Sequence, residues 1–544
     1  MSHRFAGIAL ILLSTLGGSA FAASSLEDQT RRWEERNPGS LPHWLTPDES
    51  ARLDEIGRTF SQTAPPALPA REVAEFERMG SVLIRYPFGI PISLIAALAE
   101  ETPLVTLVSS TSQENTVRAQ YVAAGMNPAS YSFLRAPTNS YWTRDYGPWF
   151  VQTADEVAVV DFPYNRPRPL DDDVPLVVAA SLGMEVYGMP LIQTGGNWMS
   201  DGYGTAASTD LVVEENPGLT EAQMAEMVQN YVGVGRYFTL PDPNNTYIDH
   251  IDCWSKFLDV DKVMVREVPT SHAQYDEIEA AAAWFAQTPS GWGTPYEVYR
   301  VWTPNNQPYT NSLILNGRVF VPLAGSSWDD EALEAYRQAM PGYEVLGFTG
   351  TWESTDALHC RVKGLADPGL LHIHHVPAPA DVAAWQPVEL RTQLTVGSGQ
   401  ALIEDSLRCW FRVDGGDWSA LPLTADGAEW RVFLPALAAD QELDYYLQAA
   451  DASGRFEQHP FTGRADPHHL QAVGGTLAAP VISLQLQGTQ LVLNWEPVPG
   501  ATRYQVEVRA GLLDPWQVWE EAAQPGWSEA LGESRLYRVR AVAP

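Results

Sequence analysis

Short apolar strands alternate with helices from residue 82 to residue 346, and this alternation restricts the fold more than any other feature of the chain. Such alternation is typical of an α/β domain, which we expect to end near Val376. The units differ too much in sequence to establish an internal repeat. Strands are expected at 82–87, 104–108, 156–162, 211–213, 263–265, 312–315, 319–322 and 343–346, and helices at 92–100, 113–124 (N-capped by Ser112), 220–233, 275–288 and 329–340.

The pattern changes after a Pro-Ala linker that begins at Pro377. Short strands separated by turns predict an immunoglobulin-like β-sandwich over 377–473, and a second linker precedes residues 474–544. That last region has a strand Trp and a late Tyr-containing strand, and it resembles a fibronectin type III module. The α/β domain is therefore assigned to 71–376.

Two further regions precede the α/β domain. Residues 1–22 have the charge, apolar core and small-residue cleavage site of a signal peptide, which predicts an exported, secreted protein. No later stretch reaches the ~20 apolar residues of a transmembrane helix. Residues 23–70 form a Pro-rich, charged N-terminal region in which Thr46 and Pro47 begin a helix expected over 47–60.

The chain has 544 residues and a formal net charge of −33, which disfavours binding to nucleic acid or to anionic lipid. The same charge attracts cations, including arginine-bearing peptides, although solubility outside the cell explains it equally well. Of the three cysteines, at least one must stay unpaired. Cys253 and Cys409 lie in strand-like runs typical of buried thiols, whereas Cys360 follows His359 in a polar stretch that suits a reactive thiol.

Four short segments carry the chemistry: Thr143–Trp149 with Asp145, Gly195–Trp198, His250-Ile251-Asp252, and Leu358-His359-Cys360. On a strand, His250 and Asp252 would point to the same face and could converge on one ligand. A thiol, an imidazole and two carboxylates suit attack on a planar cation better than hydrolysis of an amide. Each residue also has a simpler interpretation, namely a buried thiol, a surface ion pair, or a loop cap.

Taken together and in order, these motifs resemble the guanidine-modifying (pentein) superfamily. Within it, the chain looks most like the bacterial, porphyromonad-type peptidylarginine deiminases, with agmatine deiminases as the next relatives. The resemblance covers roughly residues 80–376 and implies a five-bladed β/α propeller. The matching segments are Thr143–Pro148, Asn165–Pro169, Gly195–Asn197, Asp201–Gly204, Tyr247–Asp252, Tyr309–Ser312 and Asp356–Arg361.

The resemblance also implies roles for the site residues. Asp145 and Asp252 would hold the substrate guanidinium, Cys360 would attack its central carbon, and His250 would transfer protons. Asn311 would orient these groups, and neither a metal nor another cofactor would be needed. Because a thiol near two carboxylates resists ionisation, we expect the pKa of Cys360 to be raised.

Arg166 and Arg168 distinguish between two substrate classes. If the segment is extended around Pro167, both side chains point to one side. The resemblance implies that they bind the carboxylate of a C-terminal arginine, which suits two guanidinium groups. Agmatine carries an ammonium at that end, which two arginines would repel. Otherwise the pair would be a solvated basic surface facing 171–173. Trp142 and Tyr247 are expected to line the pocket.

Two other acidic or histidine-rich segments invite a metal interpretation. Residues 171–173 are three aspartates that could bind calcium, but acidic runs are usually solvated loops. Of His372, His374 and His375, two share a strand face, yet no further ligand lies at a telling spacing, so a structural role is favoured. Three rival functions remain open: an agmatine or small-guanidine deiminase, a cysteine peptidase using Cys360 and His250, and a non-catalytic exported binding protein.

Overall fold

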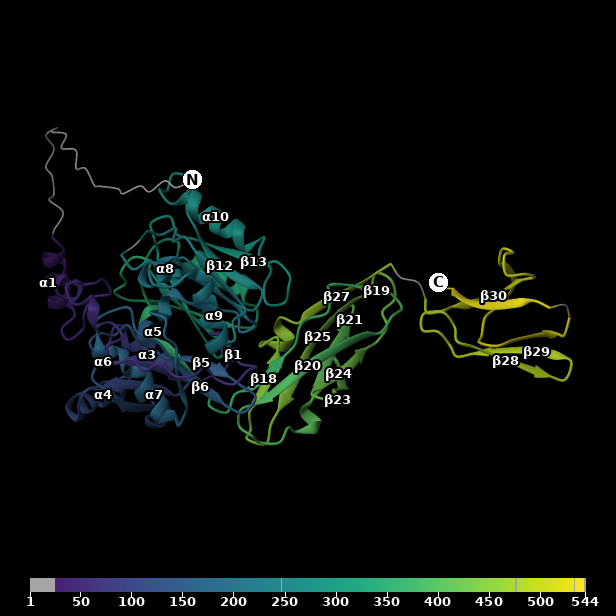
Figure 1. Cartoon of the computed structure of the whole chain (residues 1–544), viewed down its shortest axis with the longest axis horizontal. Coiled ribbons are helices and arrows are strands. Elements are labelled where there is room, and N and C mark those ends of the chain that lie inside the picture. The colour runs from purple at the N-terminus through teal and green to yellow at the C-terminus, as the bar shows by residue number, and fades with distance from the viewer. Residues whose placement is uncertain (1–24, 246, 475–476, 533, 543–544) are drawn as a thin grey trace.

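Three bodies lie in a row along the long axis of the protein (Figure 1). The computed structural model describes residues 25–245, 247–474, 477–532 and 534–542, so the predicted signal peptide lies outside the described residues. The first body contains all the helices longer than one turn that lie in the described ranges. Within those ranges, no helix combines the length and the apolar character that crossing a membrane requires.

The first body is built from five small sheets, each following the same plan. In each, two antiparallel strands are followed by a helix and a parallel strand, which is a ββαβ unit. This repeat is a structural finding that the sequence did not reveal. The first unit takes β17 (Lys363–Ala366) from the far end of the domain, and it contains β2 (Met79–Arg85), β3 (Leu104–Val108) and β4 (Tyr131–Arg135).

The other four sheets follow in chain order. They are β1 (Arg71–Glu72) with β5 (Trp149–Gln152), β6 (Val157–Asp161) and β7 (Val186–Gly188); β8 (Met199–Ser200) with β9 (Thr205–Thr209) and β10 (Arg236–Leu240); β11 (Ser255–Phe257) with β12 (Lys262–Glu267) and β13 (Glu297–Trp302); and β14 (Leu313–Leu315) with β15 (Arg318–Leu323) and β16 (Glu344–Thr349).

Helices cover the outside of these sheets, and most begin where the sequence places them. The β14–β15 hairpin turns at Asn316 and Gly317, both in the left-handed region, as the Asn-Gly pair predicts. Thr220 caps α9 with a full capping box. The helices are α3 (Ile92–Leu98), α4 (Thr111–Ala123), α5 (Thr143–Tyr146), α6 (Pro169–Asp172), α7 (Val174–Leu182), α8 (Leu211–Glu215), α9 (Glu221–Val232), α10 (Tyr275–Phe285) and α11 (Asp329–Ala339).

Three expectations about local structure are wrong. Residues 211–213 form the start of α8 instead of a strand, because the strand of that unit is β9, immediately before it. The helix expected over 47–60 is one turn, α2 (Pro47–Ser50), followed by a 3₁₀ turn at Leu53–Glu55. The N-cap of α4 is Ser110, not Ser112.

The second body consists of two antiparallel-rich sheets packed on one core that includes the buried Cys409. The strand β18 already belongs to it, although it precedes residue 377. The strands are β18 (Leu371–His374), β20 (Val388–Val396), β23 (Thr424–Asp426) and β24 (Glu429–Leu434) in one sheet, and β19 (Asp381–Ala383), β21 (Arg408–Val413), β22 (Ser419–Pro422), β25 (Glu442–Ala450), β26 (Phe456–His459) and β27 (His468–Val473) in the other.

The second body is fixed to the first by charged and aromatic contacts. Arg455 pairs with Asp367 at 2.6 Å, and Arg78 pairs with Glu457 at 3.3 Å.

The third body has two three-stranded sheets around Trp495. Its strands are β28 (Ile482–Gln487), β29 (Gln490–Trp495), β30 (Arg503–Arg509), β31 (Gln517–Ala522), β32 (Trp527–Ala530) and β33 (Leu536–Val542).

Candidate active site

Each of the five units contributes one segment to a common site, and each segment lies just before the first strand of its unit. Because the five positions are equivalent in the repeat, residues that are far apart in sequence converge. The segments are α5 with Asp145 before β5, the turn Gly195–Asn197 before β8, the turn Ile251–Cys253 with Asp252 before β11, Asn311 before β14, and the turn His359–Arg361 with Cys360 before β17.

Cys360 is fully buried, and Asn311 positions it. The side-chain nitrogen of Asn311, Nδ2, lies 3.2 Å from Sγ of Cys360. The side-chain oxygen, Oδ1, accepts from the backbone N–H groups of Ala357 and His359 at 2.9 and 3.0 Å. Asn311 therefore holds both the sulfur and the turn that carries it. Sγ also lies 3.5 Å from Oδ2 of Asp252, so the thiol and one predicted carboxylate are in contact.

His250 and Asp252 come together, but not on a strand. Residues 251–253 form a 3₁₀ turn, anchored by Asn197, whose Oδ1 accepts from the backbone N–H of Ile251 at 3.3 Å. The expectation that the two side chains share a strand face is therefore wrong. The 3₁₀ turn precedes β11 and also contains Cys253, which was expected in a strand.

Gly196 explains why the turn before β8 has two glycines. A Cβ on Gly196 would lie 2.5 Å from Nδ1 of His250 and 2.6 Å from Oδ1 of Asp145. A Cβ on Gly195 would lie 2.2 Å from the carbonyl oxygen of Arg144. The absence of both side chains lets three units approach closely at the site.

The site contains buried polar atoms that have no hydrogen-bond partner within the described structure. Native proteins rarely leave such atoms unsatisfied, so they mark a place where a ligand binds. They include three carboxylate oxygens, which are the acceptors that a ligand rich in N–H groups requires. These are Oδ1 of Asp145, Asp252 and Asp356, and both ring nitrogens of His250 are also without a partner.

The pKa of Cys360 is raised well above its ordinary value, which is the expected direction. Burial is the largest cause, followed by Cys253, Asp252 and Asp356. Burial also lowers the pKa of His250 to about 4, although Asp145 opposes this shift. At neutral pH the site therefore contains a thiol and a neutral imidazole that is able to accept a proton.

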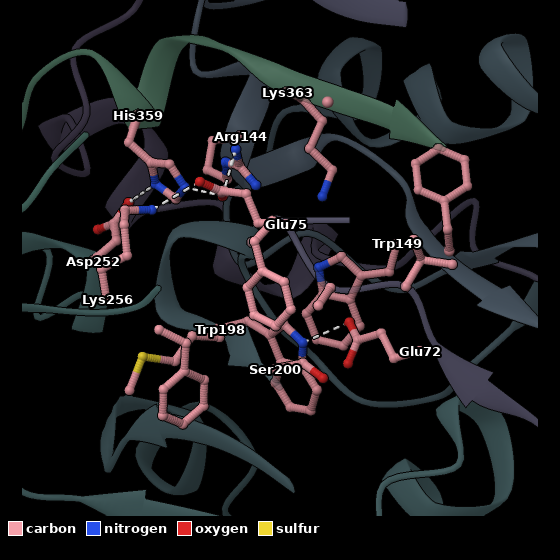
Figure 2. A pocket seen from close by; sticks show the side chains of 18 of the residues that line it. Glu72, Glu75, Arg144, Trp149, Trp198, Ser200, Asp252, Lys256, His359 and Lys363 are labelled. Carbon is pink, nitrogen blue, oxygen red and sulfur yellow. Dashed lines mark hydrogen bonds and ion pairs between the residues drawn. The ribbon is translucent and has the colours of Figure 1, made fainter. Parts of the chain in front are cut away.

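Behind the reacting groups lies a charged cavity (Figure 2). The ring of His359 bridges Asp252 and Glu75, with Nδ1 2.6 Å from Oδ2 of Asp252 and Nε2 2.5 Å from Oε2 of Glu75. Glu75 also pairs with Arg144 and Lys256, each at 2.9 Å. His359 therefore supports Asp252 from the side of this cavity, a role that the sequence analysis missed.

Arg166 and Arg168 are buried, so the interpretation as a solvated basic pair is wrong. They lie in a bend rather than an extended segment, since the backbone N–H of Arg168 donates to the carbonyl of Arg166 at 2.8 Å. Nε of Arg168 lies 2.5 Å from Oε1 of Glu49. Asp171, expected in a solvated loop, is buried and accepts from Ser140 Oγ at 2.7 Å.

Two predicted pocket residues contact the site in different ways. The ring of Trp142 stacks on His43 with 4.1 Å between centroids. Tyr247 donates its hydroxyl to Oδ2 of Asp356 at 3.0 Å and remains partly exposed. His43 and Asp356 were not identified from the sequence. Asp356 lies within the quoted segment Asp356–Arg361, but His43 has no motif around it.

Among the residues that the structure describes, two triads offer ligand atoms within 4.8 Å of one another, and both include His43. Its two ring nitrogens are already engaged by carboxylates, with Nδ1 2.5 Å from Oδ2 of Asp356 and Nε2 bonded to Asp145. The protein's own ion pairs therefore account for this geometry without a metal ion. The triads are His43, Asp145 and His250, and His43, Asp356 and Cys360.

Comparison with known proteins defines the class. Agmatine deiminase of Enterococcus faecalis matches in structure with a TM-score of 0.50 and 20% identity, over 56% of this chain and 99% of that one. Agmatine deiminase of Medicago truncatula is 24% identical over 326 residues, which are 49% of this chain and 85% of that protein. The α/β body thus has the fold of the guanidine-modifying deiminases.

The model of the Porphyromonas-type peptidyl-arginine deiminases matches residues 90–361, half of the chain, and the protein belongs to that family. The matched residues include the four segments with Asp145, Gly196, His250 and Cys360. Deiminases of this class hydrolyse guanidino C–N bonds, in agreement with a thiol placed against buried carboxylates.

Proposed function

We propose that the protein hydrolyses the guanidinium of peptidyl arginine, preferably a C-terminal arginine, to citrulline and ammonia. The observation that carries this proposal is the contact of Cys360 with Asp252 in a site that also holds Asp145 and His250. Two carboxylates that accept from a planar cation place its central carbon near the sulfur.

The reaction proceeds in two halves. As the cation binds, Cys360 loses its proton to His250 and attacks the guanidinium carbon, so that an S–C bond forms. The C–N bond then breaks, and ammonia leaves with the proton that His250 returns. In the second half, water loses a proton to His250 and attacks the thiouronium carbon. The S–C bond breaks, and the product is the urea group of citrulline.

Arg168 supports the proposed substrate class. This guanidinium binds the Glu49 carboxylate through Nε at 2.5 Å and Nη2 at 3.2 Å. A group that binds one carboxylate in this way suits the terminal carboxylate of a peptide and repels the ammonium of agmatine. Agmatine or another small guanidine remains the alternative substrate, because related proteins carry that name.

We further propose that the five sheets form a closed five-bladed β/α propeller, supported by the pairing of β17 with β2 from opposite ends of the domain. The second and third bodies are proposed to be immunoglobulin-like and fibronectin type III-like. On the sequence of residues 1–22, we propose that the protein is exported and acts on extracellular peptides or proteins.

The test is a comparison of citrulline release from four substrates: a peptide ending in arginine, a peptide with internal arginine, free arginine and agmatine. A mass gain of about one dalton in the peptide indicates deimination, whereas a shorter peptide indicates proteolysis. Cys360→Ala must abolish the activity. If Cys360→Ala leaves the activity intact, Cys360 is not the nucleophile; if the wild type acts on none of the four substrates, a non-catalytic binding protein is favoured. Preference for agmatine would overturn the substrate assignment.

A further inference from the structure

The N-terminal arm, residues 25–63, packs over the active site. It contains α1 (Leu26–Arg36) and α2, and it is anchored near its middle and at its C-terminal end. Near the site, Trp142 donates its indole N–H to the carbonyl of Leu41 at 3.1 Å. At its far end, the backbone N–H of Thr63 donates to the carbonyl of Gly188 at 3.2 Å. In Figure 1 the arm, in purple, lies at the end of the catalytic body opposite the sandwich.

His43 enters the site and occupies Asp145, one of the two carboxylates proposed to hold the guanidinium, together with the neighbouring Asp356. Its ring nitrogens bond to Asp145 and to Asp356, and its ring stacks on Trp142 with an interplanar angle of 10°. The side chain is 1% exposed. A flat cation that donates two N–H groups to two carboxylates and lies against an aromatic face has the recognition chemistry of an arginine side chain.

His43 is a cation in this position. Burial alone would lower its pKa, but the carboxylates of Asp356 and Asp145 raise it to about 9. The other titratable groups around it are the neutral His250, at 5.1 Å between ring centroids, and the thiol of Cys360, which shares a cluster with His43 and Asp356. His43 therefore donates from both nitrogens at neutral pH.

Glu49 takes the place of the terminal carboxylate, which is the other end of the proposed substrate. Its carboxylate accepts from Nε and Nη2 of Arg168, and both side chains are buried. The capping box with Thr46 fixes Glu49 at the start of α2, so its orientation is set by the fold of the arm. Arg166 adds a bond from Nε to the carbonyl of His43 at 3.4 Å.

We propose that residues 41–49 are an intramolecular substrate mimic that holds the deiminase site closed, with His43 in place of the substrate guanidinium and Glu49 in place of its terminal carboxylate. This inference rests on the proposed function. A segment that only completed the fold would have no need for two buried ions inside a catalytic site, because burying ions is costly unless they are paired.

The segment that connects the arm to β1 allows the arm to move away from the active site. Residues 64–69 have no helix or strand, and all but Pro66 are exposed. Displacing the arm, or cutting this connection, would expose Asp145, Asp356 and Arg168 to a peptide without altering the five sheets. Substrate then competes with the arm, and the apparent affinity falls by the fraction of molecules that are open.

The first experiment uses the full chain with His43→Ala or Glu49→Gln, and His469→Ala on the exposed face of β27 as the matched control. Two rates are measured: kcat/KM for a peptide ending in arginine, and labelling of Cys360 by 2-chloroacetamidine. In the labelling reaction an S–C bond forms, chloride leaves, and the thiol proton passes to buffer. Opening a site that is closed in most molecules raises both rates at least about tenfold.

A second experiment does not depend on point substitutions. A protease recognition sequence replaces residues 64–67, and the purified full chain is cut there. Activity and labelling must rise after cleavage. A synthetic peptide of residues 25–63 must then inhibit competitively, and the same peptide with His43→Ala must inhibit at least about tenfold more weakly.

The outcomes separate the two proposals. Increased labelling with no deimination of any guanidine overturns the proposed function and leaves the closed arm supported. Deimination and labelling that do not change in the variants and after cleavage overturn the inference. A loss of deimination in a folded His43→Ala chain also overturns it, because His43 would then serve the reaction instead of blocking it.

Discussion

Nδ2 of Asn311 lies 3.2 Å from Sγ of Cys360, while Oδ1 of Asn311 accepts from backbone N–H groups on both sides of Leu358. One side chain thus ties the start of β14 to the turn that carries the nucleophile. Replacement by Ala leaves these N–H groups without a partner and frees the turn.

For Asn311→Ala we expect kcat to fall about 100-fold, because the sulfur loses its fixed position. The free energy of unfolding should fall by about 2 kcal/mol, because buried N–H groups lose their acceptor. Steady-state kinetics and urea unfolding measure the two effects. Asn305→Ala, at an exposed site, should change neither. Unchanged kcat in Asn311→Ala would refute the positioning role.

Gly196→Ala should inactivate the enzyme. The new Cβ would lie 2.5 Å from His250 and 2.6 Å from Asp145, so both side chains must move, and kcat/KM should drop at least about 100-fold. Gly218→Ala is the matched control, since its Cβ meets nothing within 4 Å. Equal activity in the two variants would show that the close approach is not needed.

The raised pKa of Cys360 predicts slow alkylation in the absence of substrate. The thiolate forms only when the pH exceeds that pKa, so the rate with iodoacetamide should stay low at pH 7 and still be rising at pH 9. Burial also raises the pKa values of Cys253 and Cys409 to about 12, so a slow rate alone does not identify the thiol that reacts. Mass spectrometry must therefore locate the label. Rapid labelling of Cys360 at mildly acidic pH would contradict the prediction.

Arg166 and Arg168 should determine the preference for a terminal carboxylate. In chains cut at 64–67, where Glu49 no longer competes, replacing both by Ala should raise KM for a peptide ending in arginine about 10- to 100-fold. The kcat value and the kinetics with a peptide amide should change little. A KM unchanged for the free-acid peptide would defeat the assignment.

A buried histidine cluster at the junction of the first two bodies should make the fold sensitive to acid. It joins Tyr203 to His459 at 2.8 Å, His459 to His468 at 3.0 Å, and His375 to Tyr445 at 3.0 Å. Burial lowers the pKa of His375 to about 4, below the 6.5 of the unfolded chain. As the pH falls below 6.5, the unfolded state takes up the proton first, and stability is lost.

The expected loss from His375 is about 2 kcal/mol at pH 5, relative to pH 7.5. Since buried carboxylates such as Glu457, with a pKa of about 7, act in the opposite sense, the measured quantity is the difference between wild type and His375→Gln. Urea unfolding at both pH values should show a smaller acid loss in this variant. The exposed His469→Gln should match wild type. If His375→Gln retains the full acid loss, the assignment fails.

The reacting groups could be predicted from sequence because each lies in a short motif whose spacing fixes local geometry. Asp145, Gly196, His250, Asp252 and Cys360 all converge. The local backbone structure was predicted less accurately. The sequence of residues 211–213 predicts a strand, but a short apolar run of this kind equally suits a short helix packed on a sheet, which is what the structure contains.

The closed state of the site could not be predicted. His43 and Glu49 act through contacts with residues about 100 positions away, at Asp145 and Arg168, and nothing in their immediate neighbours signals this. The support of Asp252 by His359 and Glu75 is missed for the same reason, since it depends on how the five units pack. Motifs report the chemistry of a site, whereas tertiary packing decides its access.

The chain passes from the nucleophile to the sandwich through β17 and β18 alone, and Arg455 of the sandwich grips Asp367 between those two strands. A shortened protein ending at residue 376 would keep β18 but lose β20, the strand that it pairs with. The sandwich therefore holds the chain that follows the nucleophile, and its removal would leave β18 unpaired five residues beyond the strand that begins next to the reactive turn.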